Sequence, residues 1–261
     1  MTNFCLVYLA VSDLLASIVA IPLIVICNTT ADLDCTAMDF ATRFIAISTI
    51  LHLMVVSTER FIMIVYPMYY IKLVTKKRII VVLGSVWVFS LTVVLIQLSW
   101  VINETQAVKY DLSYSLTTFC GIVLPALCFM IFIYSKIFTV LRIQIKKIKR
   151  HNIPESLQAN KVSEDVASKR SEHRAVLVFA LMIITFVLGW FPYFIFTVLY
   201  DLGIEVPAAE FWLFLRFATS LMNPLLYTFL KTDFKKALIG RIRSESQRFY
   251  KSVNTQNETR I

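Results

Sequence analysis

The stretch that most constrains the fold is residues 37–67, AMDFATRFIAISTILHLMVVSTERFIMIVYP. Its middle, residues 44–57, is apolar apart from small hydroxyl side chains and one histidine. A helix rises about 1.5 Å per residue, so about 20 such residues cross the roughly 30 Å hydrocarbon core of a bilayer. The stretch carries Arg43 toward one end and Glu59 beside Arg60 toward the other. Because charges at membrane depth are costly without partners, these residues are candidate functional groups.

Composition indicates a membrane protein with many spans. Of the 261 residues, 58% are hydrophobic and only 16% are charged, and the mean hydropathy is +0.71. Soluble domains are nearer half apolar, with about a quarter of their residues charged. The charged residues cluster between long apolar runs, whereas a β-barrel would show alternating segments of about ten residues. We therefore expect an all-α, polytopic transmembrane helix bundle in the lipid bilayer.

The net charge of +9 lies on one side of this predicted bundle. Of the 26 lysines and arginines, 23 fall at residue 60 or in segments 72–78, 136–174 and 231–260. The segments on the opposite side hold one lysine and several acids. This is the positive-inside pattern, so we expect the basic segments and the C-terminus in the cytosol. The same distribution argues against nucleic acid as a partner.

Six spans are predicted, and they form one transmembrane domain over residues 1–243. They cover about residues 4–26, 37–66, 79–102, 114–138, 175–199 and 208–230. Residues 67–78 are expected to form a basic inner loop and residues 151–171 a polar cytosolic loop. Apolar residues four apart among lysines predict an amphipathic membrane-surface helix over 232–242. A polar, disordered tail is expected over 244–261.

Cysteines and glycosylation sequons describe the outer side. Of the five cysteines, only Cys27, Cys35 and Cys120 lie toward that side, so at most one disulfide is expected. No cysteine or histidine spacing suggests a metal. Sequons at Asn28 and Asn103 fall on the outer side predicted from charge, which makes both asparagines candidates for glycosylation.

A set of motifs gives the chain a resemblance to a known family. They are LAVSDLL (9–15), Cys35, ERF (59–61) with Pro67 after it, Trp87, Pro125, FVLGWFPY (186–193) and NPLLY (223–227). In this order the sequence resembles the rhodopsin-like (class A) G-protein-coupled receptors over nearly its whole length. The resemblance implies a seven-helix receptor in the plasma membrane that passes an extracellular ligand signal to heterotrimeric G proteins. Arrestin and receptor kinases are further partners that it implies.

The chain departs from the family pattern in several places. Six spans are counted where the family has seven, so we expect the first family helix to be missing from this sequence. The conserved triplet of the family ends here in Phe61 where tyrosine is usual, and Tyr134 lies nine residues after the family proline where eight is typical. The second outer loop offers no cysteine, which leaves Cys35 to pair with Cys120 or Cys27 or to stay free.

The resemblance assigns a switch to the inner end of the bundle, built on the ERF triplet that ends at Phe61. In the family, the arginine that matches Arg60 pairs with its neighbouring acid, here Glu59, and with an acid on a later helix, here Glu172. Activation releases it to meet the G protein, and Tyr227 of NPLLY swings toward it. A partly desolvated pair of this kind can bias two helix packings by a few kcal/mol. The alternatives are an ordinary interfacial ion pair and a purely structural kink at NPLLY.

The outer half of the bundle is where the family binds its ligand. The resemblance places six residues there: Thr42, Arg43, Trp190, Tyr193, Phe194 and Arg216. Amine receptors have an aspartate at the place of Thr42, so a monoamine is disfavoured. Opsins have the retinal lysine where Phe217 stands, so retinal is disfavoured as well. Arg43 and Arg216 can hold a carboxylate or phosphate bidentately.

Two of these residues have structural alternatives. Arg43 can instead snorkel outward or pair with Asp39 or Glu210. Trp190 beside Pro192 is expected to couple the pocket to the swing of its helix, with Phe186 packed beneath it. Its alternative is ordinary core packing.

A polar centre is expected at mid-membrane from Asp13, Thr49, Ser220 and Asn223. An unpaired carboxylate there costs about 2.5–3.5 kcal/mol. In the family, such oxygens hold a hydrated sodium ion, and a water-filled network without metal is the alternative. No other cofactor is expected. His52 is expected to be a hydrogen-bonded packing residue rather than a proton relay.

The sequence gives little support to other functional classes. No nucleophile with its base and no phosphate-cradling loop is present, so an enzyme is not expected. A transporter or channel would often show internal repeats, and none is visible. A receptor that binds ligand without signalling is the remaining alternative.

Overall fold

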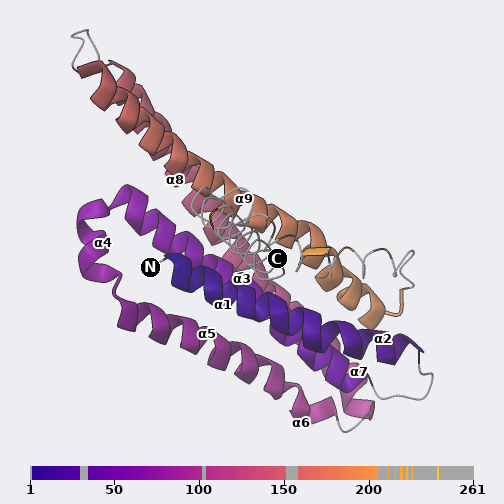
Figure 1. The fold of residues 1–261 in the computed structure, drawn as a ribbon. Helices are drawn as coiled ribbons and strands as arrows, with labels where there is room; N and C mark the ends of the chain where they lie inside the picture. Colours follow the sequence, from indigo (N-terminus) through magenta and orange to yellow (C-terminus); the bar gives the residue numbers. More distant parts are fainter. Residues whose placement is uncertain are drawn as a thin grey trace, which may run out of the picture.

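The computed structural model in Figure 1 is an elongated bundle of helices. The structure describes residues 2–29, 35–101, 104–150 and 158–204, together with Phe211, Leu215, Ala218, Thr219, Met222, Leu225 and Gly240. These residues contain no strand, as expected for an all-α bundle. The predicted span over 208–230 and the surface helix over 232–242 lie mostly outside the described residues, and the tail lies wholly outside them.

The described chain forms nine α-helices and two π-helical segments. In order these are α1 (Thr2–Leu15), the π segment Ala16–Ala20, α2 (Ile21–Thr29), α3 (Thr36–Val65), α4 (Pro67–Leu73), α5 (Lys76–Ile96), α6 (Leu98–Val101), α7 (Glu104–Thr118), the π segment Phe119–Val123, α8 (Leu124–Arg150) and α9 (Gln158–Asp201). Five segments are long and apolar enough to cross a membrane. They are Val7–Cys27, Thr36–Val65, Lys76–Trp100, Tyr110–Gln144 and Val176–Leu199.

Helix α3 is the central helix of the bundle. Its most apolar window is 67% buried in protein, whereas the corresponding windows of the other four segments are 29–35% buried. Helices α1, α5 and α8 pack around it, and α9 touches it as well. Because α3 faces protein and not lipid, it tolerates buried polar side chains such as Ser48, His52 and Ser57.

Both π segments end just before a proline. Ala16–Ala20 precedes Pro22, and Phe119–Val123 precedes Pro125. A proline ring clashes with the carbonyl four residues earlier, and in each case that carbonyl lies inside the π segment. The wider π turn relieves the clash without breaking the helix, so helical structure continues through each proline.

The inner loop expected over 67–78 contains a helix. Pro67 occupies the first turn of α4, where its missing N–H costs nothing and its fixed φ suits a helix. Backbone bonds from Tyr69 and Tyr70 to the Tyr66 carbonyl start the turn. The next helix, α5, begins after Thr75, whose hydroxyl accepts a bond from the Arg78 amide.

Two expected loops are also shorter than predicted. The polar loop expected over 151–171 is wrong beyond residue 157, because α9 already begins at Gln158. The stretch that follows is rich in Ala, Lys and Glu, which favour helix even without an apolar face. On the outer side, α7 starts at Glu104, ten residues before the expected span.

The two ends of the bundle differ in composition. Helix α4, the end of α8 and the start of α9 lie at one end in Figure 1, and α2, α6 and the start of α3 lie at the other. Helices α8 and α9 pack on one another and extend together beyond α4. The α4 end carries the basic segments and is therefore the inner end by the positive-inside rule.

Candidate functional site

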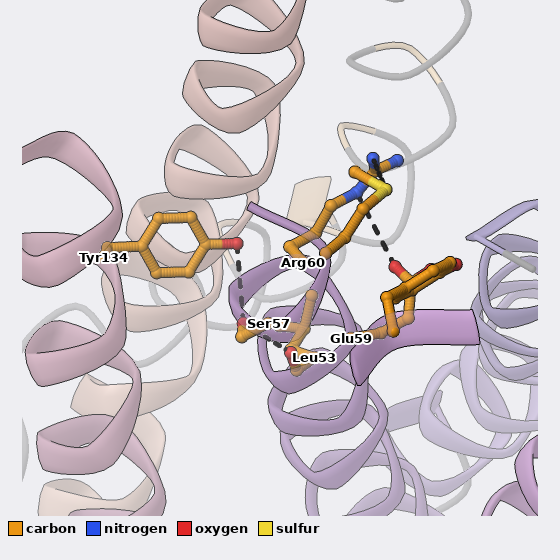
Figure 2. Close-up of polar contacts among 7 residues, drawn as sticks. Leu53, Ser57, Glu59, Arg60 and Tyr134 are labelled. Atoms are coloured by element: carbon orange, nitrogen blue, oxygen red, sulfur yellow. Dashed lines mark hydrogen bonds and ion pairs between the residues drawn. The ribbon is translucent and has the colours of Figure 1, made fainter. Parts of the chain in front are cut away.

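Arg60 and Glu59 form a buried ion pair at the inner end of α3. Nε of Arg60 lies 3.8 Å from Oε2 of Glu59, and the two residues are only 7% and 4% exposed. Figure 2 shows the two side chains beside one another. Nη1 of Arg60 also approaches Sδ of Met63 at 3.9 Å, so the guanidinium lies along its own helix, one turn toward the C-terminus.

Tyr70 of α4 completes this cluster and was not predicted from the sequence. Its hydroxyl donates a 2.6 Å hydrogen bond to Oε1 of Glu59. Burial raises the pKa of Tyr70 above its usual value near 10, and the bond to the Glu59 carboxylate raises that pKa further. The sequence feature that could have pointed to this contact is the pair of tyrosines after Pro67. It indicates a contact with Glu59 only once α4 is known to be a helix. The switch is therefore tied to α4.

A second contact missed by sequence reasoning lies one turn above Arg60. Ser57 Oγ donates to the Leu53 carbonyl at 2.6 Å and lies 3.4 Å from the Tyr134 hydroxyl. Figure 2 shows Tyr134 reaching across from another helix toward Ser57. Ile133 and Tyr134 are both buried, because this part of α8 packs on α3 and on α9. The unusual spacing of Tyr134 therefore does not turn it away from the bundle.

The remaining predicted switch residues are only partly described. Phe61 packs edge to face on Tyr66, with 5.8 Å between the ring centroids. Glu172 belongs to α9, but its side chain lies outside the described part of the structure, as does all of Tyr227. The pairing of Arg60 with Glu172 and the approach of Tyr227 remain predictions.

Trp190 links the middle of α9 to the outer half of the bundle. The indole is 5% exposed and stacks on Phe186, with 6.1 Å between the ring centroids, which confirms the packing expected from the sequence. On the other side it meets Tyr193 edge to face at 5.8 Å. Pro192 lies inside the helix at this level. One helix thus carries aromatic contacts from the outer cavity toward the core.

The outer cavity lies between α3, α7 and α9 and has a volume of about 10 Å³ within the described walls. Its walls are a guanidinium, four hydroxyl-bearing side chains and two apolar ones. They belong to Arg43, Ser115, Thr118, Tyr193, Thr197, Ile47 and Phe194. Three of the six predicted pocket residues line this cavity, namely Arg43, Tyr193 and Phe194. Thr42 and Trp190 are buried nearby without lining it, and Arg216 lies outside the described residues.

Arg43 is held firmly against α7. The residue is 8% exposed, so it does not snorkel outward. Its Nη1 donates to Ser115 Oγ at 3.2 Å, and its guanidinium carbon lies 5.2 Å from the centre of the Tyr114 ring. Within the described part of the chain, Arg43 makes no ion pair, and its Nε makes no hydrogen bond. Asp39 is beyond ion-pair distance, and Glu210, the other expected partner, lies outside the described residues.

The cavity walls on α7 were not predicted. Ser115 and Thr118 lie three residues apart and so share one helix face. Sequence reasoning looked for this wall only among the charged and aromatic residues of the family motifs. The hydroxyl pair lies inside the span predicted over 114–138, and its only signal in the sequence is the helical spacing.

The mid-membrane polar centre is partly described. Asp13 and Thr49 are 4% and 3% exposed. The Ser12 hydroxyl lies 3.4 Å from Thr49 Oγ1 and 3.3 Å from Ser48 Oγ, which ties α1 to α3. Ser220 and Asn223 lie outside the described residues. The sodium site therefore remains a prediction.

His52 fits the expected packing role. It is fully buried, and its Nδ1 lies 2.7 Å from the Ser48 carbonyl, which requires the proton on Nδ1. Its ring stacks on Tyr8 at 6.5 Å and meets Trp87 edge to face at 5.7 Å. The imidazole thus joins α1, α3 and α5.

A disulfide joins Cys27 of α2 to Cys35 at the start of α3, with 5.7 Å between their Cα atoms. Of the two partners left open for Cys35, the structure selects Cys27. Cys120 is exposed and unpaired in the π segment before α8. The bridge closes a short outer loop. The glycosylation candidate Asn28 lies in α2, next to Cys27, but its side chain is not among those that the structure describes. The other candidate, Asn103, lies outside the described residues.

Comparison with known proteins identifies the family. Residues 1–227 match the model described as 7 transmembrane receptor (rhodopsin family). The chain belongs to this receptor family. The human histamine H2 receptor is 31% identical over 271 residues, which cover 90% of this chain and 68% of that receptor. Mouse trace amine-associated receptor 4 is 27% identical over 91% of this chain and 74% of its own length, and horse adenosine receptor A2a is 25% identical over 93% and 64%.

Membership of the receptor family confirms several expectations. The chain is a multi-pass membrane protein of the class A receptor type, and it is not an enzyme. The family couples extracellular ligands to G proteins. The names of the similar receptors include two for amines, so they do not support the expectation that a monoamine is disfavoured.

Proposed function

We propose that this receptor carries an extracellular ligand signal to a heterotrimeric G protein through a switch centred on Arg60. In the inactive packing, the guanidinium stays beside Glu59, and the inner ends of α8 and α9 stay against α3. Ligand in the outer cavity favours the packing in which Arg60 leaves its acidic partners, including Glu172, and these inner ends open. The observation that carries the proposal is the buried Arg60–Glu59 pair with the Tyr70 hydroxyl bonded to it.

Helix α4 offers a surface for the G protein. Met68 is 84% exposed and Ile71 is 80% exposed, while Tyr70 between them turns inward to Glu59. Exposed apolar side chains at the inner end, beside basic Lys72, suit a protein partner or the headgroups of anionic lipid. A partner that binds this face is therefore mechanically close to the switch.

The orientation in the cell follows the charge distribution. The receptor lies in the plasma membrane, with the outer cavity facing the extracellular side and the C-terminus in the cytosol. Arrestin and receptor kinases act on the same inner face. The supporting feature is the concentration of lysine and arginine in the inner segments.

The ligand is not a monoamine, and it carries an anionic group. Thr42 is 2% exposed and offers a hydroxyl, not the carboxylate that a protonated amine needs. A second cation about 4 Å from the Arg43 guanidinium would be repelled by about 4 kcal/mol at an effective dielectric constant near 20. Retinal is also excluded, because a Schiff base needs a lysine and position 217 is phenylalanine.

A sodium ion is proposed at the mid-membrane centre, held by Asp13 and Thr49 together with Ser220 and Asn223. A buried carboxylate among hydroxyl groups has the hard oxygen ligands that such a cation prefers. The ion would neutralise the Asp13 charge and favour the inactive packing. Replacing Asp13 with asparagine should remove any effect of sodium concentration on ligand-free nucleotide exchange, and a persistent effect would exclude this site.

The switch is tested by nucleotide exchange on purified G protein with the full chain in lipid nanodiscs. Glu59→Gln is expected to raise ligand-free exchange, and adding Arg60→Ala should return it to the level of empty nanodiscs. Arg142, an exposed arginine of α8, provides the matched control, and Arg142→Ala in the same background should leave exchange high. Normal exchange in the chain that lacks Arg60 would contradict the proposal. Ligand binding without exchange by any variant would indicate a non-signalling receptor.

A further inference from the structure

We propose that the cavity beside Arg43 binds a small organic monocarboxylate. The carboxylate lies on the guanidinium, and the rest of the ligand lies against the hydroxyl-bearing wall formed by α7 and α9. This inference rests on the proposed function, because it names the ligand class of the receptor's outer site.

Arg43 is a buried cation with a hydrogen-bond donor still unmatched, its Nε. The residue is 8% exposed, and no carboxylate of a described residue is within ion-pair distance of it. Burying a charge is costly unless it is paired and hydrogen-bonded. At the other end of the same helix, Arg60 has Glu59 beside it. An arginine with no ion-pair partner among the described residues, at the wall of a cavity, is suited to bind an acidic group of a ligand.

The guanidinium of Arg43 is already held in one orientation by its contacts with α7. Nη1 is bonded to Ser115, and the cation lies over the face of Tyr114. The Tyr114 hydroxyl in turn donates a 2.9 Å bond to the Val93 carbonyl of α5, which fixes the ring. Arginine has five N–H donors in a rigid fork, and the described contacts use one of them. The free donors, including the buried Nε, match the two oxygens of a carboxylate.

The size and polarity of the cavity limit what can reach Arg43. Within the described walls the cavity has a volume of about 10 Å³, room for about one water, so the ligand group that reaches Arg43 there is small. Beyond the guanidinium, the wall offers the hydroxyls of Thr118 and Thr197 and the apolar surface of Ile47 and Phe194. Thr197 Oγ1 donates to the Tyr193 carbonyl at 2.9 Å, so its oxygen remains able to accept a hydrogen bond. A short acid with one polar substituent and an apolar edge fits these groups.

The charge of the described wall, which excludes Arg216, favours a carboxylate over a phosphate. One guanidinium in the described wall balances one negative charge, whereas a phosphate monoester carries about −1.5 to −2 at neutral pH. Both anions share the chemistry that arginine recognises, so the experiment must separate them. The structural alternative is that Arg43 only staples α3 to α7 through Ser115 and Tyr114.

The test uses the full chain in nanodiscs and a panel of small aliphatic and aromatic monocarboxylic acids. Each acid is matched with its primary amide, the amine of the same skeleton and the corresponding phosphate monoester. Binding is measured by calorimetry and by the concentration-dependent rise in melting temperature. At least one acid is expected to bind the wild-type chain, with its amide and amine binding about 10- to 100-fold more weakly.

Variants then locate the site. Arg43→Gln should weaken the acid by about 10- to 100-fold, and Arg43→Lys by less, because the charge remains while the fork is lost. Thr118→Val and Thr197→Val should weaken only acids with a polar substituent. Arg142→Gln, at an exposed position on α8, should bind like wild type. If Arg43→Gln fails to fold, the wild-type comparison of acid with amide still decides the question.

Several outcomes would overturn the inference: no acid in the panel binds, the amides or amines bind as well as the acids, the phosphate esters bind better, or Arg43→Gln keeps full acid affinity. The proposed function fails separately. Acid binding that depends on Arg43 but never stimulates nucleotide exchange would leave the ligand class standing and remove the signalling role. Nucleotide exchange that depends on Arg60 but is driven only by a non-acidic ligand would leave the signalling role standing and remove the proposed ligand class.

Discussion

The two ends of helix α3 hold the same chemical group in opposite circumstances. Arg60 at the inner end has a carboxylate beside it and a tyrosine bonded to that carboxylate. Arg43 at the outer end is equally buried, but its described partners are a hydroxyl and an aromatic face. Seventeen residues separate the two, or about 26 Å along a helix. The difference teaches that a carboxylate of the fold pairs with Arg60 and can release it, whereas Arg43 has no ion-pair partner among the described residues and keeps donors for a ligand.

The largest expected effect comes from removing the inner compensation. Glu59→Gln removes the neighbouring acid of the buried Arg60, and breaking one side of a buried pair costs about 3–5 kcal/mol. The inactive packing should lose most of this, so ligand-free nucleotide exchange should rise by more than tenfold. The measurement is the rate of GTPγS uptake by purified G protein. An unchanged rate would show that the inner pair is structural, and the contrast between the two arginines would disappear.

The next effect concerns the outer end alone. Cys27→Ser and Cys35→Ser should each lower the free energy of unfolding by about 2–3 kcal/mol, the loop-entropy value for a bridge that closes a loop of about this length. The double variant should lose no more than either single one, because the same bridge is removed. Thermal unfolding measures the loss, and ligand-free exchange should stay at the wild-type level. A large rise in exchange would mean that the outer tether also controls the switch.

Tyr70 should give a smaller effect at the inner end. Tyr70→Phe removes a hydrogen bond to a charged group, worth about 1.5–3 kcal/mol, so ligand-free exchange should rise less than in Glu59→Gln. In a variant that combines Tyr70→Phe with Glu59→Gln, the carboxylate that Tyr70 binds is already absent. The two increases in ligand-free exchange should therefore not add. Full additivity would show that Tyr70 acts through another residue.

The same tyrosine predicts a pH dependence. The pKa of Tyr70 is raised in the folded state, first by burial and then by its bond to Glu59. The stabilisation is therefore fully present below the unfolded value of about 10 and is lost as the pH rises above it. The melting temperature of the wild type should fall more steeply than that of Tyr70→Phe above about pH 10. Parallel curves would contradict the buried hydroxyl bond.

The smallest effect is expected at Tyr134. Tyr134→Phe keeps the ring packing and removes one weak contact with Ser57, 3.4 Å long, so stability should change by about 0.5–1.5 kcal/mol at most. A matched Ser57→Ala variant should show the same direction in thermal unfolding. A larger loss of stability in either variant would mean that the Tyr134–Ser57 contact stabilises the inactive packing about as much as the Arg60–Glu59 ion pair does.

Much of the fold could be predicted because hydropathy and charge are readable one residue at a time. The apolar run around residues 44–57 fixed the position of α3, and the basic segments fixed the inner side. Helix α4 was missed because a basic stretch of few residues reads as a loop, although Pro67 is a helix-start residue. The early start of α9 was missed because its first turns are polar and have no apolar period.

The site was harder to predict than the spans, because its contacts join distant parts of the sequence. Arg60 and Glu59 are neighbours in a motif and were found. Tyr70 and Tyr134 reach the same region from α4 and α8, and only the packing of those helices brings them there. The hydroxyl wall formed by Ser115 and Thr118 has no motif, and its role follows only from the position of Arg43.

The most direct test of the switch is a distance measurement between α4 and the inner end of the membrane-spanning part of α9, which begins at Val176. Spin labels at exposed positions 68 and 177, in a chain whose free Cys5, Cys120 and Cys128 are replaced by serine, report this separation by pulsed electron resonance. The account predicts one short distance in the wild type and a longer population that grows in Glu59→Gln and on adding nucleotide-free G protein. A distribution that is the same in all three samples would contradict the release of Arg60 as the event that opens the receptor.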